Sequence, residues 1–283
     1  MLILTGLGLL AAWSARHYKS TQPMVRAAAP NVGMVEPIRA ATSFPEVPTA
    51  RDAYILDAVQ RGEADIRWAF VRSSYQGHNG EFRVFADAMK IQGVRVNLTA
   101  AGQQRVADTL GCMLLTLKLA DLIWAQRQVT LAPITMSSTQ HDVLVMGTVA
   151  RMIEYSQRVD AAIADLPAPP EGIVCTVGKH WVIDDALALP AHKGRAENYG
   201  WHNTRFGPPC ATPAAGPGCH VLQDPGTAHN LLHTDYSQVC VLVSRDCRVD
   251  DAPMDLMRVL QDPVLAMLAN HRGRMRVLRQ PGT

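Results

Sequence analysis

The sequence predicts an α+β fold, with a helical middle segment packed on a mixed or antiparallel sheet and a long, loop-rich C-terminal half. Two observations lead to this class. Residues 100–166 carry apolar side chains at helical spacing, whereas several short apolar runs before and after them suit strands. Between residues 167 and 226, Pro and Gly are frequent enough to interrupt regular structure repeatedly.

We expect three segments along the 283 residues. Residues 1–15 are uncharged and rich in Leu and Ala, with Arg16 and Lys19 directly after them. This pattern favours residues 1–19 as a signal peptide, with a retained membrane anchor or an ordinary buried helix as alternatives. Five prolines make residues 20–50 a linker. Residues 51–283 would then form a single globular domain, exported to the periplasm or beyond the cell.

Helices are expected over residues 49–62, 100–126, 142–166 and 253–268. The second of these contains Gly111 as an interruption, with a break near Thr116. Alternating or continuous apolar runs predict strands over residues 66–72, 81–86, 94–98, 173–177, 181–183, 239–243 and 274–279. The last of these would close the fold.

The composition excludes one class of partner. A net charge of +2 and the lack of a basic stripe interleaved with aromatic residues argue against nucleic-acid binding. An apolar content of 48% is typical of a globular protein with a large core. Six cysteines suit export if they form disulfides, and Cys210–Cys219, Cys240–Cys247 and Cys112–Cys175 are possible pairs; buried free thiols are the alternative.

The candidate site lies in residues 178–237, which hold six of the ten histidines. The candidate catalytic residues are His202, His233, Asp235 and Ser237. Clustered His and Asp on loops rich in Gly and Pro are typical of a site carried on irregular backbone. The candidate substrate-binding residues are Lys179, His180, Trp201 and Tyr236, with a structural role in the core as the alternative for Trp201.

Two chemistries fit these residues. In the first, His202, His229, His233 and Asp235 hold a divalent metal such as zinc, because histidines four apart share one face of a helix. In the second, a histidine activates Ser237 as a nucleophile. The sequence contains neither an H-E-x-x-H motif nor a G-x-S-x-G motif, so the zincin and ordinary α/β-hydrolase versions are excluded.

Four short elements together carry a resemblance: Gln104…Ala107-Asp108…Gly111, Thr116…Asp121-Leu122-Ile123-Trp124, Tyr199-Gly200-Trp201-His202 and His233-Thr234-Asp235-Tyr236-Ser237. Their combination resembles a group of uncharacterised exported bacterial proteins that share a Tyr-Gly-Trp-His element and a downstream Asp-Tyr-Ser element ahead of a buried strand. The resemblance covers roughly residues 66–245. It implies export and supports the choice of site residues, but it implies no particular reaction. At Gln238 the chain departs from the group, which often has His there.

We therefore expect an exported hydrolase of cell-envelope or extracellular material, acting on a cell-envelope polymer or peptide, with peptidoglycan amide bonds as one candidate substrate. The alternative is a non-catalytic envelope protein that binds or assembles other components. The two differ in one geometric expectation. We expect the side chain of His202 to meet residues 233–237 in one cleft, whereas a His202 more than about 10 Å from both His233 and Ser237 would favour the non-catalytic protein, because catalytic groups act within hydrogen-bond reach.

Overall fold

The computed structural model describes residues 44–136, 143–167 and 171–283. The predicted signal peptide and most of the predicted linker lie outside these residues. Phe44 is already buried, with its ring 5.5 Å from that of Tyr54, and helix α1 (Pro48–Gln60) begins within the predicted linker. The folded unit therefore starts before the predicted boundary at residue 51.

The larger sheet has the strand order β13-β12-β3-β2, with β6 paired to β12, and all of its pairings are antiparallel. Its strands are β2 (Trp68–Tyr75), β3 (His78–Phe85), β6 (Cys112–Met113), β12 (Val243–Val249) and β13 (Ala252–Asp255). The strands predicted over residues 66–72 and 81–86 are confirmed as β2 and β3, which together form a hairpin. Gln76 and Gly77 form its two-residue turn, and both have the positive φ that such a tight turn requires.

The second sheet carries the candidate site. Its strands are β9 (Lys179–Val182), β10 (Arg195–Asn203) and β11 (His220–Asn230), in the order β11-β10-β9 and antiparallel throughout. Two smaller sheets complete the strand content. One joins β1 (Ala64–Asp65), β4 (Lys90–Ile91) and β5 (Val94–Arg95), and the other pairs β7 (Val129–Thr130) with β8 (Val174–Cys175) in parallel.

The predicted helix over residues 100–126 is two helices. Gly111 adopts the left-handed conformation with φ 64° and ends α2 (Ala100–Leu110). Thr116 then begins α3 (Leu117–Ala125) by accepting a hydrogen bond from the amide of Leu119. The predicted helix over residues 142–166 is also divided, into α4 (Val143–Met146) and α5 (Val149–Ala164); Asp142 itself lies outside the described residues.

The C-terminal predictions need correction. Residues 253–268 form two short helices, α6 (Leu256–Gln261) and α7 (Ala266–Ala269), after strand β13. Residues 274–279 are not a strand. Residues 239–242 are buried as predicted, but they run as extended chain before β12 begins at Val243. Three short 3-10 helices connect the strands of the second sheet: η1 (Asp185–Ala188), η2 (Pro190–His192) and η3 (Pro213–Ala215).

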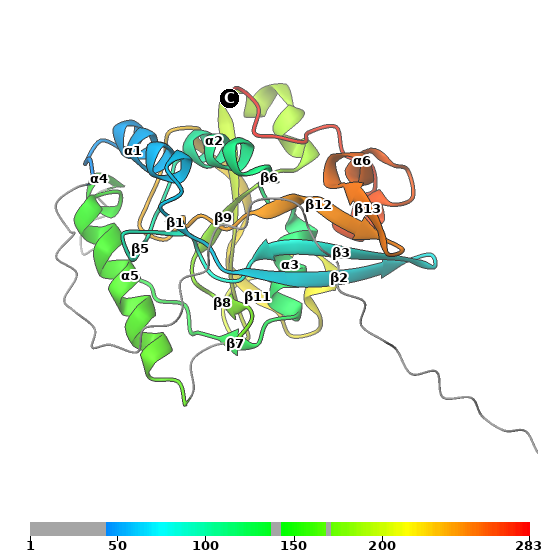
Figure 1. Ribbon diagram of the computed structural model, residues 1–283, viewed down its shortest axis with the longest axis horizontal. Helices are drawn as coiled ribbons and strands as arrows, with labels where there is room; N and C mark the ends of the chain where they lie inside the picture. Colours follow the sequence, from blue (N-terminus) through cyan, green and yellow to red (C-terminus); the bar gives the residue numbers. More distant parts are fainter. Residues whose placement is uncertain (1–43, 137–142, 168–170) are drawn as a thin grey trace, which may run out of the picture. The chain divides into compact units, whose positions relative to one another are not determined.

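The fold is α+β, as the sequence predicted. Figure 1 shows α1, α4 and α5 on the opposite side of the folded unit from β13 and α6, with the β2–β3 hairpin extending toward the latter. The core contains apolar side chains from both larger sheets, such as Phe82 and Trp181, together with α2 and α3. No helix within the described ranges is long and apolar enough to cross a membrane.

Gly102 on α2 is predicted to tolerate no side chain. A Cβ atom there would lie 2.2 Å from Cγ of Asp52, which is buried and accepts hydrogen bonds from Thr99 at the start of the helix. Gly102→Ala should lower the free energy of unfolding by about 2–3 kcal/mol, although Ala is the better helix former. Denaturant unfolding measures this loss. Gly226→Ala is the control, since its Cβ would meet no atom closer than 3.6 Å; equal stability of the two variants would contradict the packing argument.

Candidate functional site

Strand β9 divides the candidate residues between its two faces. Successive side chains of a strand alternate, so Lys179 and Trp181 lie on one face and His180 on the other. Lys179 Nζ lies 2.8 Å from Oδ2 of Asp235, and both residues are buried. The Trp181 indole meets the rings of two histidines edge to face, with ring centroids 6.1 Å from His229 and 6.5 Å from His233.

The turn that contains Asp235 is held by its own hydrogen bonds. Oδ1 of Asp235 accepts bonds from the amide of Ser237 at 2.8 Å and from its hydroxyl at 2.6 Å. The Asp235 amide donates to Oε1 of Gln238, and Asn97 Nδ2 donates to the Asp235 carbonyl. Burial alone would raise the pKa of Asp235, but the Lys179 cation and the hydrogen bonds from Ser237 hold it below its usual value.

This arrangement gives the serine chemistry no base. The Ser237 side chain donates to a carboxylate, and only 1% of the residue is exposed. The predicted contact between Ser237 and a histidine does not occur in the described part of the chain. Lys179 also forms an ion pair with Asp235, so the expected role of its ammonium group in binding substrate is not seen.

His229 and His233 form a stacked pair. Their ring centroids lie 4.0 Å apart, and the two planes differ by 7°. The sequence interpretation placed them on a helix, but His229 is the second-to-last residue of strand β11 and His233 lies in the turn after it. Burial lowers the pKa of His229 to about 4, with the neighbouring His233 and Lys179 acting in the same direction; burial and Lys179 likewise lower the pKa of His233. Both rings are therefore neutral at pH 7.

His233 lies on the wall of an open cleft of about 540 Å³. The cleft lies between the start of α1, the start of α5 and the turn after β11. Its lining residues are Glu46, Val47, Pro48, Gly147, Thr148, Asn230, Leu232, His233 and Thr234. Neither ring nitrogen of His233 has a hydrogen-bond partner among the residues that the structure describes, and Nε2 is enclosed. Oγ1 of Thr234 is similarly buried without a partner.

His202 belongs to a different cluster. Its Nε2 lies 2.7 Å from Oδ1 of Asp121 on α3, which also accepts a hydrogen bond of 2.6 Å from the Tyr199 hydroxyl. The second oxygen of Asp121 accepts from the amide of Thr212. A regular strand would place residues 199 and 202 on opposite faces. Positive φ at Gly200 (133°) and Trp201 (55°) makes the backbone irregular here, so that both side chains reach the same carboxylate.

The prediction that His202 meets residues 233–237 in one cleft is therefore wrong: its partner is Asp121, and it does not line the cleft that His233 lines. Sequence reasoning missed Asp121 and Tyr199 as partners of this histidine. A signal for Asp121 was present, because it is a carboxylate inside the apolar stretch 117–125, where burial requires a partner.

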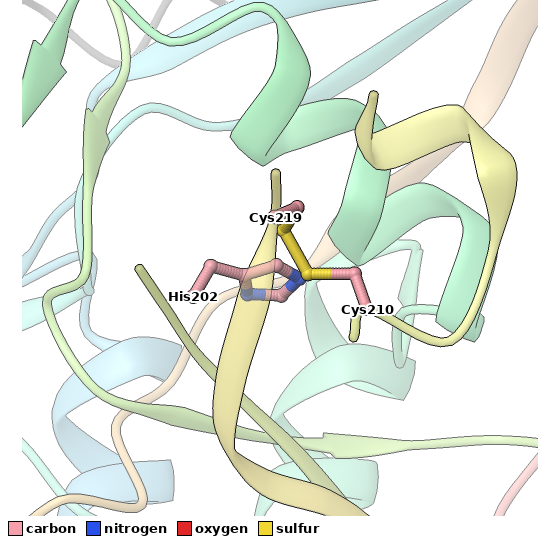
Figure 2. Close-up of side chains that lie close together, drawn as sticks. All are labelled: His202, Cys210 and Cys219. Atoms are coloured by element: carbon pink, nitrogen blue, oxygen red, sulfur yellow. A yellow bond between two sulfur atoms is a disulfide. The ribbon is translucent and has the colours of Figure 1, made fainter. Parts of the chain in front are cut away.

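The four candidate metal ligands do not converge. Within the described ranges, the one group of three potential ligands close enough to share an ion is His202, Cys210 and Cys219 (Figure 2). The two cysteines form a disulfide, so they offer no thiolate. The stacked pair also has the wrong geometry for chelation. A metal lies in the plane of each imidazole that binds it, and an ion in the plane of His229 would lie outside that of His233.

The remaining candidates are packed inside the protein. Trp201 and Tyr236 surround Tyr155, with ring centroids 6.4 and 5.2 Å away. Trp201 donates to the Tyr155 hydroxyl, and the Tyr236 hydroxyl accepts from the amide of Met136. The core alternative for Trp201 is the one observed. His180 lines an enclosed cavity of about 20 Å³ with His202, away from the open cleft.

Among the cysteines, the Cys210–Cys219 disulfide is confirmed. The other two suggested pairs are not formed, and Cys112, Cys175, Cys240 and Cys247 are buried free thiols. Comparison of the chain with family models, curated proteins and solved structures finds no match.

His180 should make stability depend on pH. Burial, reinforced by the nearby His202, lowers its pKa from 6.5 to about 3. Between these values the unfolded chain binds a proton that the folded chain does not, so stability falls as pH falls, by at most about 1.4 kcal/mol per pH unit. Between pH 6.5 and 4, we expect the free energy of unfolding of His180→Asn, measured with denaturant, to fall less than that of the original chain.

Above pH 7.5 the stability difference between the two chains should be constant, which serves as the internal control. If the free energy of unfolding of the two chains has the same slope against pH below pH 6.5, His180 is protonated in the folded protein.

Proposed function

We propose that this protein is an exported hydrolase that binds its substrate in the open cleft and uses His233 as the general base. The observation that supports this most strongly is a neutral, half-buried imidazole on the wall of that cleft, whose two nitrogens have no hydrogen-bond partner among the described residues. A histidine whose pKa is lowered stays ready to accept a proton at neutral pH.

The proton balance is simple. Since Nε2 is enclosed, Nδ1 of His233 would accept a proton from a water molecule as the water oxygen bonds to the carbonyl carbon of the substrate. The same imidazole then returns this proton to the leaving nitrogen as the carbon–nitrogen bond breaks. His229, stacked on one face of the ring, holds its orientation.

The cleft lining favours a peptide-like substrate. Val47 and Leu232 are 60% and 56% exposed, and together with Pro48 they offer an apolar rim. Asn230 and Thr148 add polar groups able to hold amides. The described lining contains one carboxylate, Glu46, and no Lys or Arg, which disfavours strongly anionic ligands. Peptide amide bonds of the cell envelope or of extracellular peptides fit this surface.

Export rests on two separate observations. The Cys210–Cys219 disulfide is compatible with an oxidising compartment. The apolar, uncharged start of the chain is typical of a signal peptide, with a retained anchor as the alternative.

A non-catalytic envelope-binding protein is the second candidate. The observation that favours it is the mutual pairing of Lys179, Asp235 and Ser237, which leaves three polar residues of the predicted site with structural partners. Under this reading the cleft binds a peptide without cleaving it.

The two candidates differ in the effect of His233→Gln. We expect the original protein to release amine groups from purified peptidoglycan or from mixed peptides. His233→Gln should lower the turnover number by about a hundredfold or more, because general-base catalysis contributes 10²–10⁴. Binding of the same material should change little.

His220→Gln is the matched control, because His220 lies on strand β11, which leads into the turn that holds His233, but outside the cleft lining. It should keep full turnover. If no substrate is cleaved, but peptides bind to the original protein and binding weakens in Leu232→Ser, the non-catalytic candidate is correct. Equal turnover of His233→Gln and His220→Gln would exclude His233 as the base.

A further inference from the structure

We propose that Lys179 is a positioning residue: its ion pair with Asp235 fixes the turn that carries His233, and so holds that imidazole at the cleft wall. This inference rests on the proposed function for its kinetic consequence, but its structural part stands without it. The connection between the ion pair and the imidazole is short. His233 and Asp235 are separated by Thr234 alone, so the ring cannot move far unless the Asp235 turn moves as well.

Both ends of the His233 turn are tied down. On its N-terminal side, the His233 amide donates to the Asn230 carbonyl at 3.3 Å, and the Leu232 amide donates to Oδ1 of Asn230 at 2.9 Å. On its C-terminal side, two contacts with Lys179 join the turn to strand β9. The Lys179 ammonium pairs with the Asp235 carboxylate, and the Lys179 amide donates to the Ser237 carbonyl at 2.7 Å.

Strand β9 therefore holds the histidine pair through two neighbouring side chains on one face. Lys179 pairs with Asp235, two residues after His233, and the Trp181 ring contacts both imidazoles edge to face. Trp181 is itself fixed, because its indole N–H donates to the Leu98 carbonyl at 3.0 Å. The contacts of Lys179 and Trp181, two residues apart on strand β9, together define the position and the tilt of the imidazole rings.

The side chain that meets the Asp235 carboxylate from β9 is the Lys179 ammonium, the one cation within salt-bridge distance in the described ranges. Two other charged groups lie near the turn. Glu46 lines the cleft beside His233, and Arg195 donates to the carbonyl of Ala228, next to His229. Neither is paired with Asp235. Removing the Lys179 charge would leave a buried carboxylate without its partner, and the turn would rearrange to hydrate it.

Lys179→Gln tests the proposal, with Lys179→Gln/Asp235→Asn as the rescue variant. The single variant leaves an unpaired carboxylate, whereas the double variant replaces the ion pair with a neutral amide–amide hydrogen bond of similar reach. We expect kcat of the single variant to fall about tenfold to a hundredfold with KM nearly unchanged, because small misplacements of a catalytic group have effects of this size. The double variant should recover most of kcat.

A second readout does not need activity. In proton NMR spectra of the full chain, the ring protons of His229 and His233 should be shielded by their mutual stacking. Lys179→Gln should remove this shielding, and the double variant should restore it. If thermal stability falls in Lys179→Gln while the ring signals and kcat per folded molecule are unchanged, the ion pair is only structural and the proposal fails. If the ring signals change and recover but no variant or parent cleaves any substrate, Lys179 does position the pair and the hydrolase proposal fails instead.

Discussion

The buried ion pair between Lys179 and Asp235 is the interaction on which the candidate site depends. It joins strand β9 of the second sheet to the turn that precedes the buried residues 239–242. Two buried charges of this kind are costly to desolvate, so the pair is stable only because hydrogen bonds from Ser237 satisfy the other carboxylate oxygen. Of the candidate catalytic residues, Asp235 and Ser237 therefore have structural partners that support the site. Their neighbour His233 is the one that lines the cleft.

The α+β class and the positions of most elements follow from local patterns. Apolar periodicity identified the helices, and Gly111 and Thr116 already marked the place where one predicted helix becomes two. The division is physically simple, since a left-handed glycine ends a helix and a threonine side chain begins the next. The C-terminal errors have another cause: residues 274–279 have strand-like alternation, but no strand in the described part of the chain pairs with them, and pairing is a tertiary property.

The site was harder to predict, because it depends on which face of irregular backbone each side chain occupies. His202 was grouped with residues 233–237 by residue type and proximity in sequence. The bulged backbone at Gly200 and Trp201 turns it toward Asp121 instead, a direction that no alternation pattern indicates. The spacing of His229 and His233 did predict that the two rings meet. It predicted the wrong element, and a stacked pair across a turn differs chemically from two ligands on a helix face.

The central claim is that His233 is a neutral, metal-free imidazole held at the cleft wall. Nitrogen-15 NMR of the histidine rings reports protonation and ligation directly. At pH 7 we expect a neutral ring for His233, with protonation only below pH 6.5, the usual histidine pKa, and with no change on addition of zinc. A ring that is protonated at pH 7, or nitrogen signals that shift on zinc binding at His229 and His233 together, would contradict the account.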